Sequence, residues 1–218
     1  MRSFGIFATL ALAAVSYAAP FSPAVEAPSV ALVSADVPAV NAGDVSIHAR
    51  CDSGCKSLPD IIIGITTEIT PLVDELKGLS AVDCTVEKIA PIVDEMKVIL
   101  SGATTEVKAL VGVPLSVVLT TANGVLSLID LCNLIATLYT LIFGCFGIVL
   151  KLVASVEYNG VCGIFADVGF LLATLLHLII SIVGGILFII QPLLAVCLSV
   201  IVQIGCGSAF SFIFGLVL

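Results

Sequence analysis

The side chains best suited to chemistry in this chain are eight cysteines and four polar residues isolated in an apolar C-terminal half: Asp130, Asn133, Asp167 and His177. His177 and its nearest acid, Asp167, are ten residues apart, so on one helix they point about 80° away from each other. The sequence contains no H-E-x-x-H, no G-x-S-x-G, no P-loop and no dinucleotide fingerprint. We therefore expect no catalytic residue, no metal site and no cofactor, and we interpret His177 as a hydrogen-bonded packing residue.

Asp130 and Asn133 are three residues apart and would share one face of a helix. A charge at the centre of a bilayer costs roughly 2.5–3.5 kcal/mol on insertion scales, so such a residue is a functional candidate. Two interpretations stay open. The pair is either part of a path for transport or ion conduction, or it lies in a polar notch between helices or outside any membrane. We favour the second.

Four cysteines in the C-terminal half predict cross-links if the chain is secreted. If three apolar helices are straight and antiparallel, a rise of 1.5 Å per residue places Cys197 level with Cys132. The same calculation places Cys206 within about 5 Å, along the helix axis, of Cys145. The candidate disulfides are therefore Cys132–Cys197 and Cys145–Cys206. The alternative is that these residues are buried free thiols that act as small apolar side chains.

The composition predicts a protein that meets an apolar environment. The chain has 218 residues, of which 60% are hydrophobic and 11% charged, whereas soluble domains carry about a quarter charged residues. The 106 residues from Val113 to Leu218 contain only four formal charges. The net charge of −8 argues against nucleic acid as a partner, because phosphates attract Lys and Arg.

The N-terminal region has the features of a secreted chain. Residues 1–18 combine Arg2, an apolar run and a small-x-small end, which together predict a cleaved signal peptide. Residues 19–56 are rich in Pro and Ala and end in the Cys51–Cys55 loop, and they predict a flexible spacer, with a propeptide at 19–50 as the alternative. For this loop we favour disulfide chemistry over zinc, because zinc sites usually supply four ligands.

Residues 57–110 predict a pair of amphipathic helices, about 57–79 and 82–110. Ser57 and Asp60 are typical of a helix start. Apolar residues recur at alternating spacings of three and four, which predicts one apolar seam on each helix. The seam residues are Ile62, Ile65, Ile69, Leu72, Leu76 and Leu79, followed by Val86, Ile89, Val93, Met96, Leu100, Ala103, Val107 and Leu110. The segment 69–77 is echoed at 89–97, and each copy predicts an Asp–Lys pair on the polar face.

Residues 111–218 predict three strongly apolar helices, at about 113–156, 161–190 and 193–217, with breaks at 157–160 and at Gln191-Pro192. Candidate transmembrane segments within them are about 134–154, 162–190 and 193–216. Small residues at a spacing of four, such as Gly169 and Ala173, predict close contacts between helices.

The fold class is therefore all-α, a bundle of two amphipathic and three apolar helices, with membrane insertion left open. Hydropathy favours a multi-pass membrane protein. The near absence of Lys and Arg from the apolar half, the missing Trp and the signal peptide favour a secreted, interface-active protein. A lipid carrier that encloses an apolar cavity is a third alternative. The expected location is the secretory pathway, ending at the cell surface, the cell wall or a membrane.

The combination of signal peptide, more polar N-terminal half, very hydrophobic C-terminal half and eight cysteines resembles the secreted hydrophobic structural proteins of mushroom-forming fungi. The resemblance is one of architecture, and no motif carries over site residues. It implies a structural role in the cell wall, extracellular matrix or aerial hyphae, with wall components or further copies of the chain as partners. The chain differs from hydrophobins, because none of its cysteines is adjacent to another.

Overall fold

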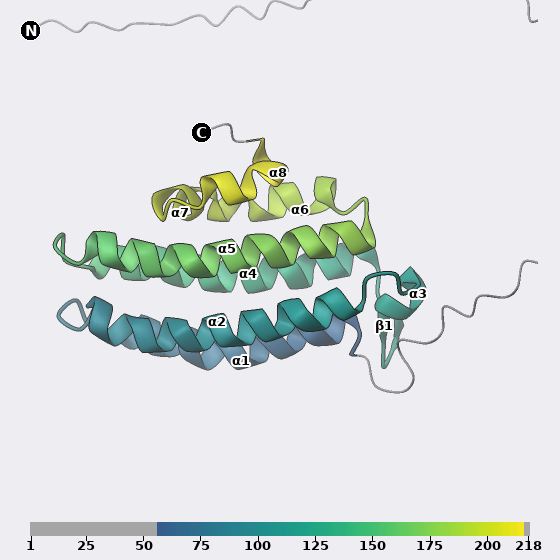
Figure 1. Cartoon of the computed structure of the whole chain (residues 1–218), viewed down its shortest axis with the longest axis horizontal. Coiled ribbons are helices and arrows are strands. Elements are labelled where there is room, and N and C mark those ends of the chain that lie inside the picture. The colour runs from purple at the N-terminus through teal and green to yellow at the C-terminus, as the bar shows by residue number, and fades with distance from the viewer. Residues whose placement is uncertain (1–55, 216–218) are drawn as a thin grey trace, which may run out of the picture. The chain divides into compact units, whose positions relative to one another are not determined.

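The structure is a computed structural model that describes residues 56–215 of the chain. These residues form helices almost throughout, with one short two-stranded hairpin (Figure 1). The predicted all-α fold is confirmed. The signal peptide predicted for 1–18, and the spacer predicted for 19–56 up to and including Cys51 and Cys55, lie outside the described residues.

The two amphipathic helices form as predicted and pair as a hairpin, here called the N-terminal hairpin. Helix α1 spans Leu58–Gly78 and helix α2 spans Val86–Ala109. Helix α1 begins where the sequence predicted, because the backbone N–H of Asp60 donates to the Ser57 hydroxyl at 3.3 Å. All the predicted seam residues are buried except Leu79 and Val86, which are partly buried. The buried stripe is wider than predicted, because each helix packs against its partner and against the next layer.

The next two helices form a second antiparallel pair, here called the central hairpin. Helix α4 spans Leu128–Leu152 and helix α5 spans Tyr158–Val183. Helix α1 packs on α4 and α2 packs on α5, so the two hairpins lie as stacked layers (Figure 1). Both helices of the central hairpin are long and apolar enough to cross a membrane, judged by length and composition alone, and about half of each apolar stretch is buried inside the protein.

The prediction that the first apolar helix begins at 113 is wrong. A short helix, α3 (Leu115–Val118), and two strands, β1 (Thr120–Thr121) and β2 (Gly124–Val125), precede α4. Gly112 has φ +85°, a backbone conformation that other residues rarely adopt, and Pro114 follows it. Gly124, at φ +116°, allows the hairpin to turn back. The sequence did not predict these breaks, because the residues around them are as apolar as those of a helix.

The third apolar helix is also not continuous. The residues after α5 form short pieces, here called the C-terminal layer, which packs on the central hairpin opposite the N-terminal hairpin (Figure 1). These pieces are α6 (Leu187–Leu194), the 3₁₀ turn η2 (Ala195–Cys197), α7 (Leu198–Gln203), the 3₁₀ turn η3 (Gly207–Phe210) and α8 (Ser211–Phe214).

Glycines set these breaks. Gly184 and Gly185 have φ values of +63° and +65° and end the helix predicted for 162–190 at Val183. Gly205, at φ +83°, interrupts the helix predicted for 193–216. The break predicted at Gln191-Pro192 does not occur at that position. Pro192 lies within α6, where its side chain is exposed to solvent. The candidate transmembrane segment 193–216 is therefore not a single helix.

Aromatic side chains fill the space between α4 and α5. The rings of Phe146 and Phe165 stack with centroids 3.9 Å apart and planes 4° from parallel. Phe143 meets Phe146 edge-on at 6.2 Å. The buried hydroxyl of Tyr139 donates to the backbone carbonyl of Leu172 at 2.6 Å, which satisfies its polar atom. These contacts hold the central hairpin as one layer.

Candidate functional site

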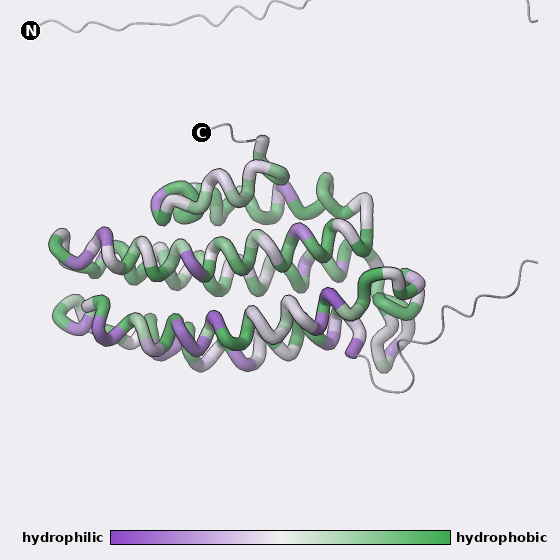
Figure 2. Tube along the Cα trace, in the orientation of Figure 1, coloured by the Kyte–Doolittle hydropathy of each residue, from purple (hydrophilic) through white to green (hydrophobic). Residues whose placement is uncertain are grey.

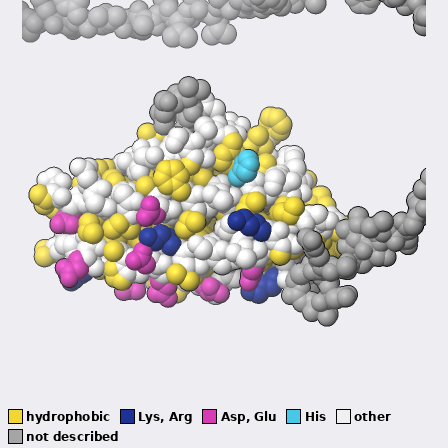
Figure 3. All heavy atoms as spheres, viewed as in Figure 1, with side chains coloured by type: hydrophobic (Ala, Val, Ile, Leu, Met, Phe, Trp, Pro, Cys, Tyr) yellow, Lys and Arg dark blue, Asp and Glu magenta, His cyan; other side chains and the backbone are white. Residues whose placement is uncertain are grey.

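The clearest functional feature is a division of charge between two sides of the molecule. The N-terminal hairpin, residues 58–109, carries thirteen formal charges, whereas residues 168–218 carry none. Figure 2 shows most of the hydrophilic residues along α1 and α2, and Figure 3 shows most of the Asp, Glu and Lys side chains over the same helices. The C-terminal layer supplies the opposite, uncharged side of the described structure.

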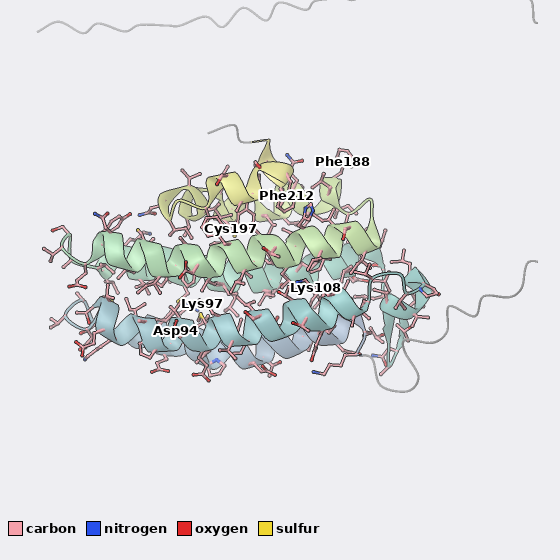
Figure 4. All side chains as sticks on the ribbon, in the orientation of Figure 1. Asp94, Lys97, Lys108, Phe188, Cys197 and Phe212 are labelled. Atoms are coloured by element: carbon pink, nitrogen blue, oxygen red, sulfur yellow. The ribbon has the colours of Figure 1, made fainter. Side chains whose placement is uncertain are left out.

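The uncharged side exposes large apolar side chains. Phe188 on α6 is 83% exposed and Val196 is 69% exposed, and Phe170 on the neighbouring α5 is 46% exposed. Figure 4 shows Phe188 and Phe212 on the short helices of this layer, away from the charged helices. The N-terminal hairpin also exposes apolar side chains, such as Ile63 and Val98, so the absence of charge is what distinguishes the C-terminal side.

Close packing fixes the C-terminal layer to the central hairpin. A Cβ atom at Gly169 would lie 2.5 Å from the Sγ of Cys206, so only glycine allows this approach. Phe210 meets Phe143 edge-on with ring centroids 5.8 Å apart. The amide of Gln203 donates to the hydroxyl of Tyr158 at 2.7 Å. The small-residue stripe that the sequence indicated at Gly169 therefore does bring two elements into contact.

The structure keeps His177 and Asp167 apart, with different partners. The ring of His177 meets that of Phe212 edge-on at 5.2 Å, and both line a groove of about 340 Å³ between α5 and the C-terminal layer. Asp167 lies 3.6 Å from the ammonium of Lys97 on α2. His177 is exposed to solvent and its contact with Phe212 is aromatic, so its interpretation as a hydrogen-bonded packing residue stays a prediction.

Asp130 lies at the start of α4, in contrast to the mid-helix position that the sequence suggested. Its backbone N–H donates to the Ser127 hydroxyl at 3.1 Å, and that hydroxyl donates to its carboxylate at 2.6 Å. This reciprocal pair caps the helix. Asn133 is exposed one turn later and lines a groove of about 730 Å³ together with Lys77 and Thr140. The two residues therefore lie at a helix end, where a charge is readily solvated.

The four cysteines predicted to pair are free thiols in the structure, so the predicted cross-links Cys132–Cys197 and Cys145–Cys206 are not formed. Cys145 donates to a carbonyl of α1 at 3.6 Å, whereas Cys206 donates to a carbonyl of α5 at 3.2 Å. The predicted alignment had assumed three straight helices. The glycine breaks of the C-terminal layer change the position of every residue after Val183.

Chemical labelling checks the state of these thiols. We expect peptide mapping without reductant to find Cys132, Cys145, Cys197 and Cys206 alkylated after unfolding but protected in the folded protein. Burial raises the pKa of Cys206 to about 11, and nearby Asp167 adds to this, so little reactive thiolate exists at pH 8. Half-buried Cys162 provides the reactive comparison. Recovery of two of the four as a cross-linked peptide would contradict the structure.

Ion pairs order the charged side. Lys97 bonds to Asp94 at 2.7 Å as predicted, and reaches across to Asp167 as well. The hydrogen bond to Asp94 is the main cause that raises the pKa of Lys97. The equivalent Asp74–Lys77 pair of the sequence echo is not among the ion pairs of residues 56–215. Figure 4 shows Lys97 beside Asp94 on α2.

The part of the chain described here holds no group of three or more His, Cys, Asp or Glu side chains placed to bind a metal ion. Comparison with protein-family models, with curated proteins and with solved structures finds no match to this chain.

Proposed function

We propose that this protein is a non-enzymatic, secreted structural protein that adsorbs at an apolar boundary of the cell surface, wall or extracellular matrix. The observation that carries the proposal is the division of charge: thirteen formal charges on the N-terminal hairpin and none after Asp167. A molecule divided in this way orients at a boundary with its charged side in water. The signal-peptide pattern and the resemblance to secreted fungal structural proteins support an extracellular location.

The driving force is removal of apolar surface from water. Burying apolar area contributes about 25 cal/mol per Å², so exposed side chains such as Phe188 and Val196 favour lipid, air or an apolar wall polymer over water. Charge on the same side would oppose adsorption, because an ion loses its hydration at the boundary. The absence of charge from residues 168–218 removes that cost.

A matched pair of variants tests the proposal. The first, Phe188→Glu/Val196→Glu, adds two charges to the C-terminal layer. The second, Ile63→Glu/Val98→Glu, adds the same two charges at exposed apolar positions on the N-terminal hairpin. We expect the first variant to lose most of its surface pressure at an air–water interface and its binding to neutral phosphatidylcholine vesicles, while the second behaves as wild type. Equal behaviour of the two variants would refute this orientation.

A multi-pass membrane protein is the second candidate, because α4 and α5 are long and apolar enough to cross a bilayer. Fractionation of a tagged chain, followed by alkaline carbonate washing, separates the two candidates. Recovery from medium, wall or the carbonate supernatant favours the adsorbed protein. Retention in the washed membrane pellet favours the integral one.

A further inference from the structure

We propose that the apolar seam between the N-terminal and central hairpins is a second, concealed lipid-contact surface. It becomes available when the N-terminal hairpin swings away from the central hairpin on a phospholipid surface. The inference rests on the proposed function, because adsorption through the C-terminal layer brings the bundle to that surface.

The concealed seam is extensive and apolar. The buried face of α1 and α2, which packs between these two helices and against α4 and α5, runs through nearly every turn. Its large side chains are almost completely buried, including Ile62, Ile69, Leu76, Ile89, Val93, Met96, Leu100 and Val107. Most charged residues of the same helices lie on the opposite, exposed face, whereas Lys97 is half-buried at the edge of the seam and reaches Asp167 on α5. Each helix of the N-terminal hairpin therefore has the character of a helix that lies in the plane of a lipid surface.

Few polar contacts hold the two hairpins together. Between residues 57–110 and 127–183 the structure records three. They are the Lys97–Asp167 ion pair at 3.6 Å, the Val86 backbone N–H donating to the Glu157 carboxylate at 3.1 Å, and the weak contact of Cys145 with α1. The Asp167 side chain is 61% exposed, so water screens the ion pair. Apolar contact supplies the remaining cohesion, and a lipid surface also removes apolar side chains from water.

The connection between the hairpins permits the movement. Residues 110–127 join α2 to α4 and form α3 and the β1–β2 hairpin, with Val118 and Leu119 buried in the closed bundle. Once released, these 18 residues can extend to about 60 Å. Gly112, at φ +85°, lies just after α2, at the point where the chain would have to bend for the N-terminal hairpin to move away. No residue from 109 to 129 is charged, so this connection can itself lie against lipid.

In the opened molecule the helices would lie in the plane of the lipid surface, because α5 carries a charged residue near its middle. Asp167 is the tenth residue of this 26-residue helix, so a spanning α5 would place its carboxylate deep in the hydrocarbon. In a helix lying in the surface plane, the same carboxylate stays at the water-facing edge. The hairpin charges are mostly acidic, nine acids against four bases in residues 58–109, so the favoured partner is a neutral phospholipid surface.

A cross-link across the seam tests the opening. Cysteines introduced by Lys97→Cys and Asp167→Cys are joined by a bis-maleimide in the folded full-length chain, with Cys51, Cys55 and Cys162 changed to serine. The matched control joins cysteines introduced by Asp83→Cys and Lys88→Cys, which are in contact within the N-terminal hairpin and do not bridge the seam. Circular dichroism checks that both cross-linked chains keep their helix content.

Native Cys145 reports the result, because its Sγ faces a carbonyl of α1 in the closed bundle. With neutral phosphatidylcholine vesicles, we expect a lipid-soluble maleimide to label Cys145 at least tenfold faster than without them in the uncross-linked chain and in the control. The seam cross-link should abolish this increase while the bound fraction stays unchanged. Binding without faster labelling, or an increase that survives the seam cross-link, would overturn the opening and leave the proposed function intact. Failure of the uncross-linked chain to bind would overturn both.

Discussion

Replacing Phe146 with alanine is expected to destabilise the folded bundle by about 3–5 kcal/mol. The ring is completely buried, stacks on Phe165 at 3.9 Å and receives the edge of Phe143. Truncation removes these contacts and leaves a cavity between α4 and α5 that rigid helices cannot close. Guanidinium unfolding followed by helical circular dichroism measures the loss as a lower midpoint with an unchanged slope.

Phe170→Ala is the control for this prediction. Phe170 is the same residue type on α5, but its side chain is 46% exposed, so its loss is expected to cost about 1 kcal/mol or less. The Phe146→Ala/Phe165→Ala double variant should cost less than the sum of the single changes, because both remove the same stacked pair. Similar losses for Phe146→Ala and Phe170→Ala would show that the aromatic stack contributes little.

The N-terminal hairpin was predictable because two independent signals in its sequence agree. Apolar residues such as Ile69 and Met96 recur at helical spacing, and polar residues fill the remaining positions. Ser57 with Asp60 marks where α1 begins. Both signals depend on a contrast between apolar and polar residues, and this region has that contrast.

The C-terminal half lacks that contrast, and so its helix ends were misplaced. When nearly every residue is apolar, periodicity cannot show which face is buried, and a helix, a 3₁₀ turn and a loop have similar composition. The informative residues were glycines. Gly112, Gly184, Gly185 and Gly205 all adopt positive φ at a break, whereas Pro192, which looked like the stronger signal, lies within α6. Residue type alone does not mark these breaks, because Gly144, Gly147, Gly163 and Gly169 lie inside α4 and α5.

The cysteine prediction failed for the same reason. Axial positions calculated at 1.5 Å per residue are reliable only along unbroken helices. The division of charge, by contrast, could be read from sequence, because it depends on which residues lie in each segment. The sequence does not show that the C-terminal layer covers the side of the central hairpin opposite α1 and α2. That arrangement depends on how the chain folds back in space.

Gly169→Ala tests how closely the C-terminal layer is fitted to the central hairpin. A methyl group at this position would lie 2.5 Å from the Sγ of buried Cys206, closer than atoms can approach. Overpacking of this kind costs about 1–3 kcal/mol, which opposes the gain of up to about 1 kcal/mol from replacing glycine inside a helix. Thermal or denaturant unfolding should therefore show a protein less stable than the control variant by about 1–3 kcal/mol.

The control is Gly163→Ala on the same helix, where nothing lies within 4 Å of the added methyl group. This change is expected to raise the free energy of unfolding by about 0.5–1 kcal/mol, because alanine has the higher helix propensity. Adding Cys206→Ala to Gly169→Ala removes the sulfur that the methyl group would meet, so the double variant should recover part of the overpacking loss. If Gly169→Ala were as stable as Gly163→Ala, the C-terminal layer would not be seated on α5 as the structure places it. The uncharged side of the molecule would then have to be defined again from a different packing of residues 187–214.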